Sequence, residues 1–196
     1  MFSLLTRRSG EPYSNKGVRY GKAEEGEAQS VEQCLFCDVS SGKAPGIMVY
    51  ENEEVSVFRT VKPYTDHHLL VTPRKHIQSV LALEGEEGAQ LVERCIVAGR
   101  TALNSLQPGL GKDALLCFHV PPFNSVDHLH LHAIGCPHTL GFIGKQKYQP
   151  GRSYCLSAEQ AVENLREQQA KGDAKAEEAC KAEEARKAEV EAKAKL

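Results

Sequence analysis

The sequence predicts an α+β domain, with about five antiparallel strands and one long helix, followed by a charged C-terminal helix. Three observations lead to this fold class. Short apolar segments are separated by turn residues, and one longer segment repeats apolar side chains at helical spacing. The end of the chain is dominated by Ala, Glu and Lys, which favour a solvated helix.

Each expected element rests on a local pattern. Two apolar segments flank the acidic turn at residues 51–54, which predicts a hairpin, and Pro73 ends the next strand. The helix carries its apolar side chains on one face, and Gln107-Pro108-Gly109 ends it. The expected strands are residues 48–50, 55–58, 68–72, 115–120 and 128–134, and the expected helix is residues 85–106.

Composition divides the chain into three parts. Residues 1–30 lack hydrophobic periodicity and are expected to be disordered. Residues 31–165 contain the compact domain. Residues 166–196 form an Ala/Glu/Lys-rich helical tail, in which Glu precedes Lys by four residues at 177/181, 183/187, 189/193 and 191/195. This tail is a candidate protein-binding segment, and a coiled coil is the less favoured alternative because large apolar heptad residues are missing.

Charge and cysteine usage limit the function classes. Residues 31–156 contain 11 Lys and Arg against 12 Asp and Glu, so no nucleic-acid partner is expected. The seven cysteines lack the spacing of a disulfide scaffold, which predicts an intracellular protein, in the cytoplasm and with the nucleus as a further compartment. No run of 18 apolar residues occurs, so no membrane association is expected.

Three of the eight histidines alternate at His128, His130 and His132. On a strand these side chains share one face, while the residues between them face the core. A single histidine there would be read as an ordinary polar-face residue, but three in alternation favour chemistry. A neutral imidazole can attack phosphorus and form a covalent phosphohistidine, while its neighbours fix its tautomer and transfer protons.

Two further motifs stand near this strand in the predicted fold. The turn at residues 123–127 places the hydroxyl of Ser125 and nearby N–H groups where they can bind phosphate, although Ser125 alone would be an ordinary turn residue. Cys34 and Cys37 have the spacing of half a tetrahedral zinc site. A redox role for this pair is less favoured, because no βαβ pattern surrounds it.

The motif His128-Leu129-His130-Leu131-His132 resembles the signature of the histidine-triad (HIT) superfamily. Other motifs resemble the Hint branch, most closely its third subgroup, which lies near aprataxin. These motifs are Cys34-Leu35-Phe36-Cys37, Pro73-Arg74-Lys75-His76-Ile77, Phe118-His119-Val120-Pro121-Pro122-Phe123 and Leu140-Gly141-Phe142. The resemblance covers about residues 33–165 and implies a HIT-like fold and a homodimer.

The resemblance also implies an activity, the hydrolysis of adenosine 5′-monophosphoramidates and related AMP conjugates, with no cofactor required for catalysis. By position, His130 is the nucleophile that transiently binds AMP, and Ser125 contacts the phosphate. His128 and His132 orient the nucleophile and contact phosphate. The nucleotide-binding residues that the resemblance implies are Phe36, Val39, Phe58, Thr60, Val61, Asn124, Ser125 and His132.

One residue departs from the family pattern. Thr60 stands where members usually carry an Asp that holds the ribose hydroxyls, so nucleotide affinity or ribose selectivity is expected to differ, because Thr cannot make a charged bidentate contact. Zinc-bearing relatives combine the cysteine pair with two histidines. That correspondence implies a structural zinc site at Cys34, Cys37, His76 and His128, and the alternative is a vestigial pair of free thiols.

An adenosine 5′-monophosphoramidase is therefore the leading prediction. An aprataxin-like deadenylase of nucleic acid is the second, and it is less favoured because the chain after residue 165 lacks a zinc-finger extension. A non-catalytic nucleotide-binding scaffold is the third, suggested by Thr60 and the charged tail.

Overall fold

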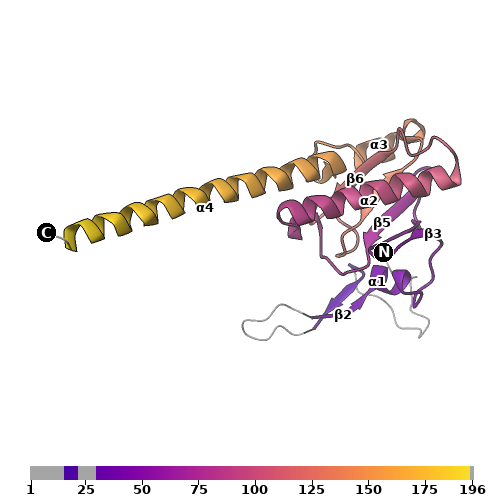
Figure 1. Ribbon diagram of the computed structural model, residues 1–196. Helices are drawn as coiled ribbons and strands as arrows, with labels where there is room; N and C mark the ends of the chain where they lie inside the picture. Colours follow the sequence, from indigo (N-terminus) through magenta and orange to yellow (C-terminus); the bar gives the residue numbers. More distant parts are fainter. Residues whose placement is uncertain (1–15, 22–29, 195–196) are drawn as a thin grey trace.

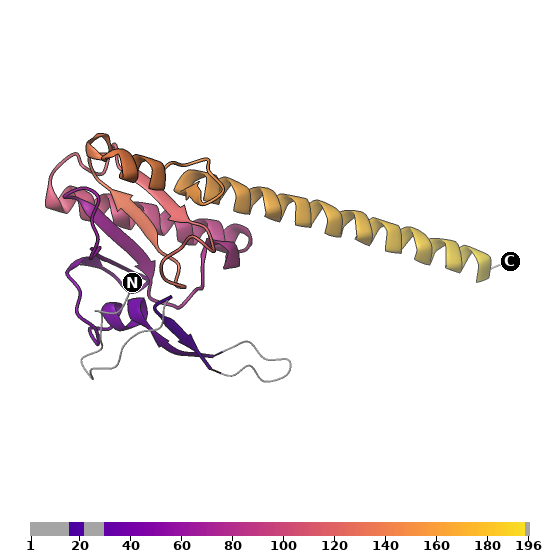
Figure 2. The same ribbon diagram turned by 180° about the vertical axis from the view of Figure 1, so that it is seen from behind.

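The computed structural model describes residues 16–21 and 30–194. Its centre is a six-stranded antiparallel sheet in the order β3-β4-β5-β7-β6-β8, and β1 and β2 form a separate pair. Figures 1 and 2 show from opposite sides that α2 covers one face of the larger sheet. The predicted α+β class is confirmed.

The strands are β1 (Val18–Tyr20), β2 (Val31–Cys34), β3 (Met48–Glu51), β4 (Val55–Arg59), β5 (His68–Pro73), β6 (Leu115–His119), β7 (Leu131–Ile134) and β8 (Cys155–Ser157). The helices are α1 (Leu35–Ser40), α2 (Gly85–Leu106), α3 (Phe142–Lys147) and α4 (Ala158–Ala194), with 3-10 turns at Val80–Ala82 and Pro137–Thr139.

The main core lies between α2 and the sheet. Along β5, Leu69 and Val71 belong to this core, whereas Leu70 packs with α1 on the other face. Gly99 allows α2 to approach closely, because a Cβ there would lie 3.1 Å from Val71 and 3.2 Å from Ala133. This packing fixes the sheet against α2 and leaves the opposite face of β5 and β7 for the histidines.

The larger sheet contains one strand more than the five that the sequence predicts. The additional strand, β8, pairs with β6 and places Ser157 opposite Cys117 and Cys155 opposite His119. Three residues are too few to show an alternating pattern, so the sequence carries no signal for this strand. The predicted strand at 128–134 is also too long, because its paired part begins at Leu131 and His128 and His130 precede it.

The C-terminal helix begins earlier than predicted, inside the compact domain. Four apolar side chains of its first turns are buried: Ala158, Ala161, Val162 and Leu165. They pack with α2, and Arg166 adds ion pairs to Glu86 and Glu93. The expected boundary at residue 165 therefore falls within one continuous helix whose beginning completes the core.

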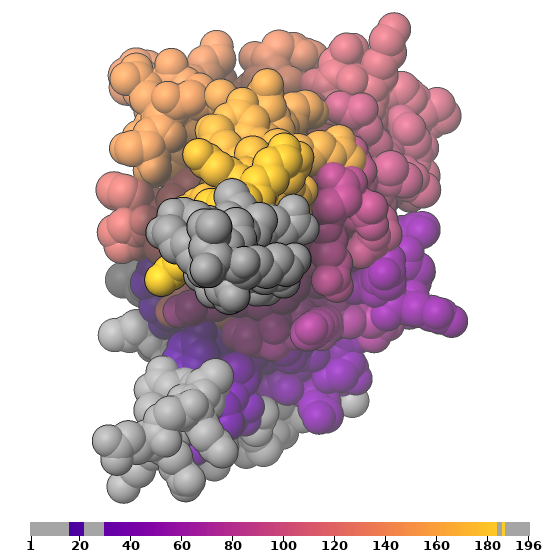
Figure 3. Space-filling view, turned by 60° about the vertical axis from the view of Figure 1, so that its left-hand side comes forward, coloured from indigo at the N-terminus to yellow at the C-terminus, as the bar shows by residue number. Residues whose placement is uncertain are grey.

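Beyond Leu165 the described side chains of α4 are exposed. The helix extends away from the body in Figures 1 and 2, and its yellow part stands in front of the body in Figure 3. The predicted pair Glu177–Lys181 is present, and the other three predicted pairs involve side chains outside the described residues. None of the helices within residues 16–21 and 30–194 combines the length and apolar content that crossing a bilayer requires.

The expected disorder over residues 1–30 is wrong for residues 16–21. β1 pairs with β2, where Val18 lies opposite Cys34, and Val18 is buried with Val126 in a second apolar cluster. This order comes from tertiary contacts, which the polar composition of the segment does not reveal. The remainder of that prediction, residues 1–15 and 22–29, lies outside the described residues.

Candidate active site

The three alternating histidines lie together on the sheet face opposite α2. His128, His130 and His132 are buried, and the rings of the last two are 5.2 Å apart. The apolar residues that alternate with them are buried in the core against α2. The predicted separation of imidazoles from apolar side chains is therefore confirmed.

His130 presents a free lone pair. Its Nδ1 lies 2.6 Å from the carbonyl oxygen of His128, and because a carbonyl only accepts, Nδ1 carries the proton. Its Nε2 is then unprotonated, and within the described residues this buried atom has no hydrogen-bond partner. Burial lowers the pKa of His130 to about 4, so the ring is neutral at physiological pH. A buried, neutral imidazole with a free Nε2 lone pair has the state that a nucleophile requires.

His132 presents the complementary group, an N–H donor. The backbone N–H of Tyr64 donates to Nδ1 of His68 at 3.3 Å, so neutral His68 carries its proton on Nε2. That Nε2 lies 3.0 Å from Nδ1 of His132, which must accept, and the proton of His132 is therefore on its Nε2. Within the described part of the chain this second Nε2 is also buried without a partner.

Strand register explains why His68 and His132 meet. In the β5–β7 pair, His68 lies opposite Ile134 and Leu70 lies opposite His132, so the two histidines are diagonal neighbours on one face. Burial and the positive charge of Lys147 lower the pKa of His68 to about 4. The same two causes, together with neighbouring imidazoles, lower the pKa of His132. Both rings are therefore neutral, as the tautomer assignment requires.

His119 and Tyr148 close the other side of His132. The His119 ring lies 4.7 Å from that of His132, and its Nε2 donates to the carbonyl oxygen of Lys147 at 3.1 Å. The Tyr148 ring lies 5.0 Å from the His132 ring, and Lys147 places its ammonium 5.5 Å from the Tyr148 centroid. Aromatic groups and one cation thus enclose the third histidine of the motif.

The predicted phosphate-binding turn precedes the histidines. Asn124 is buried, and its Nδ2 donates to the carbonyl oxygen of Val126 and to a carboxylate oxygen of Asp127. Ser125 lies between them and is exposed. Two further donors bind carbonyl oxygens of the turn: the ammonium of Lys16 donates to that of Asn124, and the hydroxyl of Tyr20 donates to that of Asp127. Asn124 and its neighbours therefore keep the turn in one conformation while Ser125 remains accessible.

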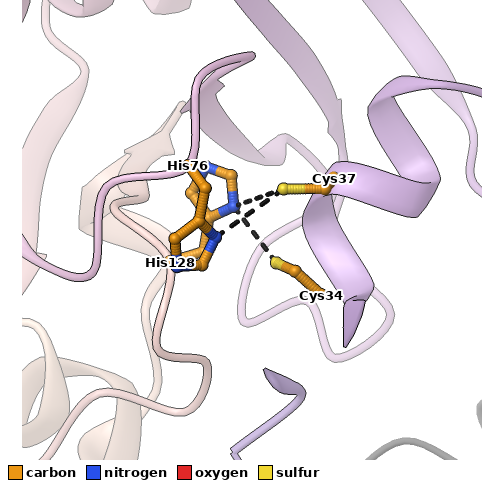
Figure 4. Close-up of side chains that lie close together, drawn as sticks. All are labelled: Cys34, Cys37, His76 and His128. Carbon is orange, nitrogen blue, oxygen red and sulfur yellow. Dashed lines mark hydrogen bonds between the residues drawn. The ribbon is translucent and has the colours of Figure 1, made fainter. Parts of the chain in front are cut away.

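A second cluster joins the cysteine pair to two histidines. One ligand atom from each of Cys34, Cys37, His76 and His128 lies within 4.8 Å of the others. Figure 4 shows both rings turning a nitrogen toward the two sulfur atoms. The sequence resemblance implied this set of four residues, and the structure brings all four together.

The donor chemistry of this cluster suits a metal ion. Nε2 of His128 donates to the carbonyl oxygen of Pro73 at 2.9 Å, so its Nδ1 directs a lone pair toward Cys34, 3.2 Å away. The hydrogen bond from Cys37 lowers the pKa of the Cys34 thiol far below its usual range, and the same hydrogen bond raises the pKa of Cys37. Two sulfur and two nitrogen donors with one thiolate can hold a metal ion.

Comparisons with known proteins agree with this arrangement. Residues 33–148 match the family model described as "Scavenger mRNA decapping enzyme C-term binding". Adenosine 5′-monophosphoramidase HINT3 of Mus musculus is 35% identical over 159 residues, which span 80% of this chain and 94% of the mouse protein. The chain belongs to the HIT family.

Other HIT relatives match shorter parts of the chain. The bifunctional adenosine 5′-phosphosulfate phosphorylase/adenylylsulfatase HINT4 of Arabidopsis thaliana is 34% identical over 108 residues, covering 55% of this chain and 73% of that protein. A solved HIT family hydrolase from Clostridium thermocellum is 28% identical, with a TM-score of 0.49, and the match covers 54% of this chain and 92% of that one.

Three of the residues that the HIT resemblance implies for nucleotide binding lie together beside His130. Phe36, Val39 and Phe58 are buried in one apolar cluster, and the Phe36 ring lies 5.2 Å from that of His130. Val61 does not join this cluster and is 67% exposed. Thr60 is partly buried, and its hydroxyl accepts a hydrogen bond from the backbone N–H of Lys62.

Sequence reasoning missed three residues of this HIT site. His68 was one of an adjacent histidine pair, and only the strand register shows that it faces His132. Tyr148 carried no signal, because it follows a short helix and belongs to no motif of the sequence. Lys16 lies in the segment predicted to be disordered, yet its ammonium reaches Asn124 in the turn that precedes the histidines.

Proposed function

We propose that this chain hydrolyses AMP conjugates that contain a P–N bond, as an adenosine 5′-monophosphoramidase, through a covalent adenylyl-His130 intermediate. One observation carries the proposal. His130 has a buried, unprotonated Nε2, and the neighbouring His132 has an Nε2–H that no described residue accepts. A nucleophile and a donor to the phosphoryl oxygens thus stand side by side.

In the first step the Nε2 lone pair of His130 attacks the α-phosphorus, and the P–N bond breaks. The electron pair of that bond ends on the departing amine, which takes up one proton from the solvent. Water then attacks the same phosphorus, the bond to His130 breaks with its electron pair returning to Nε2, and AMP leaves as the proton lost by the water returns to the solvent. The Nδ1–H bond from His130 to the carbonyl oxygen of His128 holds the ring in place and stabilises the positive charge that it acquires.

The remaining residues bind the nucleotide in this proposal. Phe36, Val39 and Phe58 form the apolar wall for adenine, and Thr60 is the residue assigned to the ribose. Asn124 shapes the turn, and Ser125 donates to the phosphate. His132 contributes its Nε2–H to the same oxygens.

The test is AMP release from adenosine 5′-phosphoramidate by the purified full chain. His130→Ala is expected to abolish turnover, because the bond-forming nitrogen is lost. His138→Ala is the matched control, since His138 is exposed and outside the site. Acid quenching followed by mass spectrometry should find AMP on the peptide that contains His130. An inert wild type, or full activity in His130→Ala, contradicts the proposal.

We also propose that the cluster of Cys34, Cys37, His76 and His128 holds a structural zinc ion. All four ligands are supplied by the protein, which is typical of zinc sites that stabilise folds. The site joins α1 to the segment that precedes β7, because His128 is shared between the cluster and the triad. A zinc ion there would connect these two segments and stabilise the fold, and the proposed reaction needs no cofactor.

Metal analysis of the purified protein tests the zinc proposal. One zinc per chain is expected in the wild type and in Cys180→Ser, whose thiol is exposed and remote. Cys34→Ser should lose the metal and unfold at a lower temperature, because one of four ligands is removed. Equal metal content in Cys34→Ser and the wild type would contradict the assignment.

A second candidate reaction has sulfate as the leaving group. The Arabidopsis thaliana relative is named for adenosine 5′-phosphosulfate, and Lys147 places a cation 5.0 Å from the Tyr64 centroid, beside the histidine group. A cation there would favour an anionic leaving group. Lys147→Gln should lower kcat/KM for adenosine 5′-phosphosulfate more than for the phosphoramidate, whereas Lys145→Gln should change neither.

We further propose that the chain acts on a small-molecule AMP conjugate in the cytoplasm as a homodimer, and that the charged part of α4 binds a protein. Val97 of α2 is 64% exposed, which leaves an apolar side chain available to a second copy. Light scattering tests the homodimer: the wild type should have the mass of a dimer, and Val97→Asp should have the mass of a monomer. A chain ending at residue 171 should lose a protein partner without losing nucleotide binding.

A further inference from the structure

The ordered N-terminal segment lies directly against the phosphate-binding turn. The ammonium of Lys16 is 2.9 Å from the carbonyl oxygen of Pro122 and 2.7 Å from that of Asn124, and it also reaches the side-chain oxygen of Asn124 at 3.2 Å. The backbone carbonyl oxygen of Lys16 accepts from the N–H of Asp127 at 3.0 Å. Lys16 therefore contacts both ends of the turn, with its side chain and with its backbone.

These contacts set the direction of one peptide bond. In a trans peptide the carbonyl oxygen and the next N–H point in opposite directions. The carbonyl oxygen of Asn124 points to Lys16, so the N–H of Ser125 points away from Lys16. Among the described residues this N–H has no hydrogen-bond partner, and Ser125 is exposed.

Two other carbonyl groups of the turn also accept hydrogen bonds. The carbonyl oxygen of Val126 accepts from Asn124, and that of Asp127 accepts from the hydroxyl of Tyr20 at 3.4 Å. A free carbonyl oxygen repels an anion, whereas a free N–H attracts one. Lys16 and Tyr20 of the N-terminal segment thus engage two carbonyl oxygens of the turn, which favours an anion beside the free N–H of Ser125.

The segment that carries Lys16 is itself anchored. The carbonyl oxygen of Gly17 accepts from the N–H of Leu35 at 2.7 Å. Gly17 has a φ of +65°, and a Cβ there would lie 3.2 Å from Val126, so glycine is needed at this approach. Val18 is buried beside it. The backbone of Lys16 is thus held in place before any substrate binds.

We propose that Lys16 is a positioning residue for the phosphate subsite. It orients the peptide between Asn124 and Ser125 so that the N–H of Ser125 is directed at an anionic oxygen of the nucleotide. The inference rests on the proposed function, because that function places the nucleotide phosphate at Ser125. Its specific consequence is that Lys16 affects recognition of the phosphate and leaves recognition of the nucleoside unchanged.

Calorimetry with AMP and with adenosine tests this consequence on the full chain. Lys16→Met should weaken AMP binding by roughly tenfold or more, because a charge-assisted contact that orients the donor is lost, while adenosine binding stays within about twofold. Lys16→Arg should restore part of the AMP affinity. Arg19→Met is the control for charge, since Arg19 lies three residues further along the chain, on β1, with an exposed side chain. It should match the wild type.

A general effect on folding would give a different result. If Lys16→Met weakens AMP and adenosine binding equally, or weakens neither, the positioning role is wrong. It is also wrong if the wild type binds AMP no more tightly than adenosine, or if only the unfolding temperature changes. Failure of the proposed reaction shows separately, as absent turnover by a wild type that still distinguishes AMP from adenosine.

Discussion

Replacing His68 by Leu tests the hydrogen-bond chain that assigns the tautomer of His132. The substitution removes the acceptor of the Tyr64 N–H and the donor to Nδ1 of His132. A buried polar group left without a partner costs about 1–3 kcal/mol, and the added apolar contact offsets part of this. We expect His68→Leu to lower the free energy of unfolding by roughly 2–4 kcal/mol at neutral pH.

The pH dependence of the free energy of unfolding gives a second, independent test of the His68 assignment. Burial and Lys147 lower the pKa of His68 from 6.5 to about 4 in the folded protein. Between these values the unfolded chain binds more protons, so the stability that neutral His68 contributes is complete above pH 6.5 and is lost as the pH falls toward 4. The difference corresponds to roughly 3 kcal/mol. His68→Leu has no histidine at this position, so acidification does not remove this contribution from its free energy of unfolding. The difference in free energy of unfolding between the wild type and the variant should therefore become smaller as the pH falls.

Denaturant unfolding near pH 7 and at about pH 4.5 measures both quantities. The chain has six tyrosines and no tryptophan, so near-ultraviolet circular dichroism of the tyrosines reports the domain without the helical signal of exposed α4. His138→Leu serves as the control, because His138 is exposed. Equal stability of His68→Leu and the wild type at neutral pH, or a deficit that is constant with pH, would refute the His68–His132 assignment.

Three further predictions concern packing and nucleotide recognition. Gly99→Val should destabilise the fold by about 1–3 kcal/mol, because its side chain would meet Val71 at the α2–sheet contact, and thermal unfolding of this variant beside Ala98→Gly measures the effect. Leu165→Ala should lower the free energy of unfolding by about 2–4 kcal/mol, because a buried side chain is removed. Deletion of residues 172–196 should leave the unfolding midpoint of the domain unchanged, and a large decrease in that midpoint would contradict the exposed state of this part of α4. Thr60→Asp should tighten AMP binding several-fold, by about 1 kcal/mol, because a carboxylate makes charge-assisted contacts with ribose, and unchanged calorimetric affinity would show that residue 60 does not hold the sugar.

Local patterns along the chain were sufficient for several parts of the molecule. The helix predicted at residues 85–106 has those bounds in the structure, because its apolar spacing and its breaker residues are both local. The hairpin formed by β3 and β4 and the strand β5 also lie where they are predicted. The alternation of His128, His130 and His132 sufficed to separate the imidazoles from the core.

Tertiary contacts decided the parts that the patterns did not show. β8 is too short to show periodicity and gains its stability from pairing with β6. The start of α4 has apolar side chains at helical spacing, but only the folded structure shows that they pack against α2. Residues 16–21 are too few to show hydrophobic periodicity, and they are ordered by contacts with the turn near Asn124, 108 positions away from Lys16. Composition describes what a segment would do alone, so it gives no account of such contacts.

The sequence by itself determined which residue types carry the chemistry, because a strand repeats every two residues and a helix every 3.6. It did not determine the proton positions in the site. Those depend on His68 meeting His132 across 64 positions, and on His128 meeting the carbonyl oxygen of Pro73 across 55. Strand register and burial establish these meetings, and they are properties of the folded sheet that no local pattern encodes.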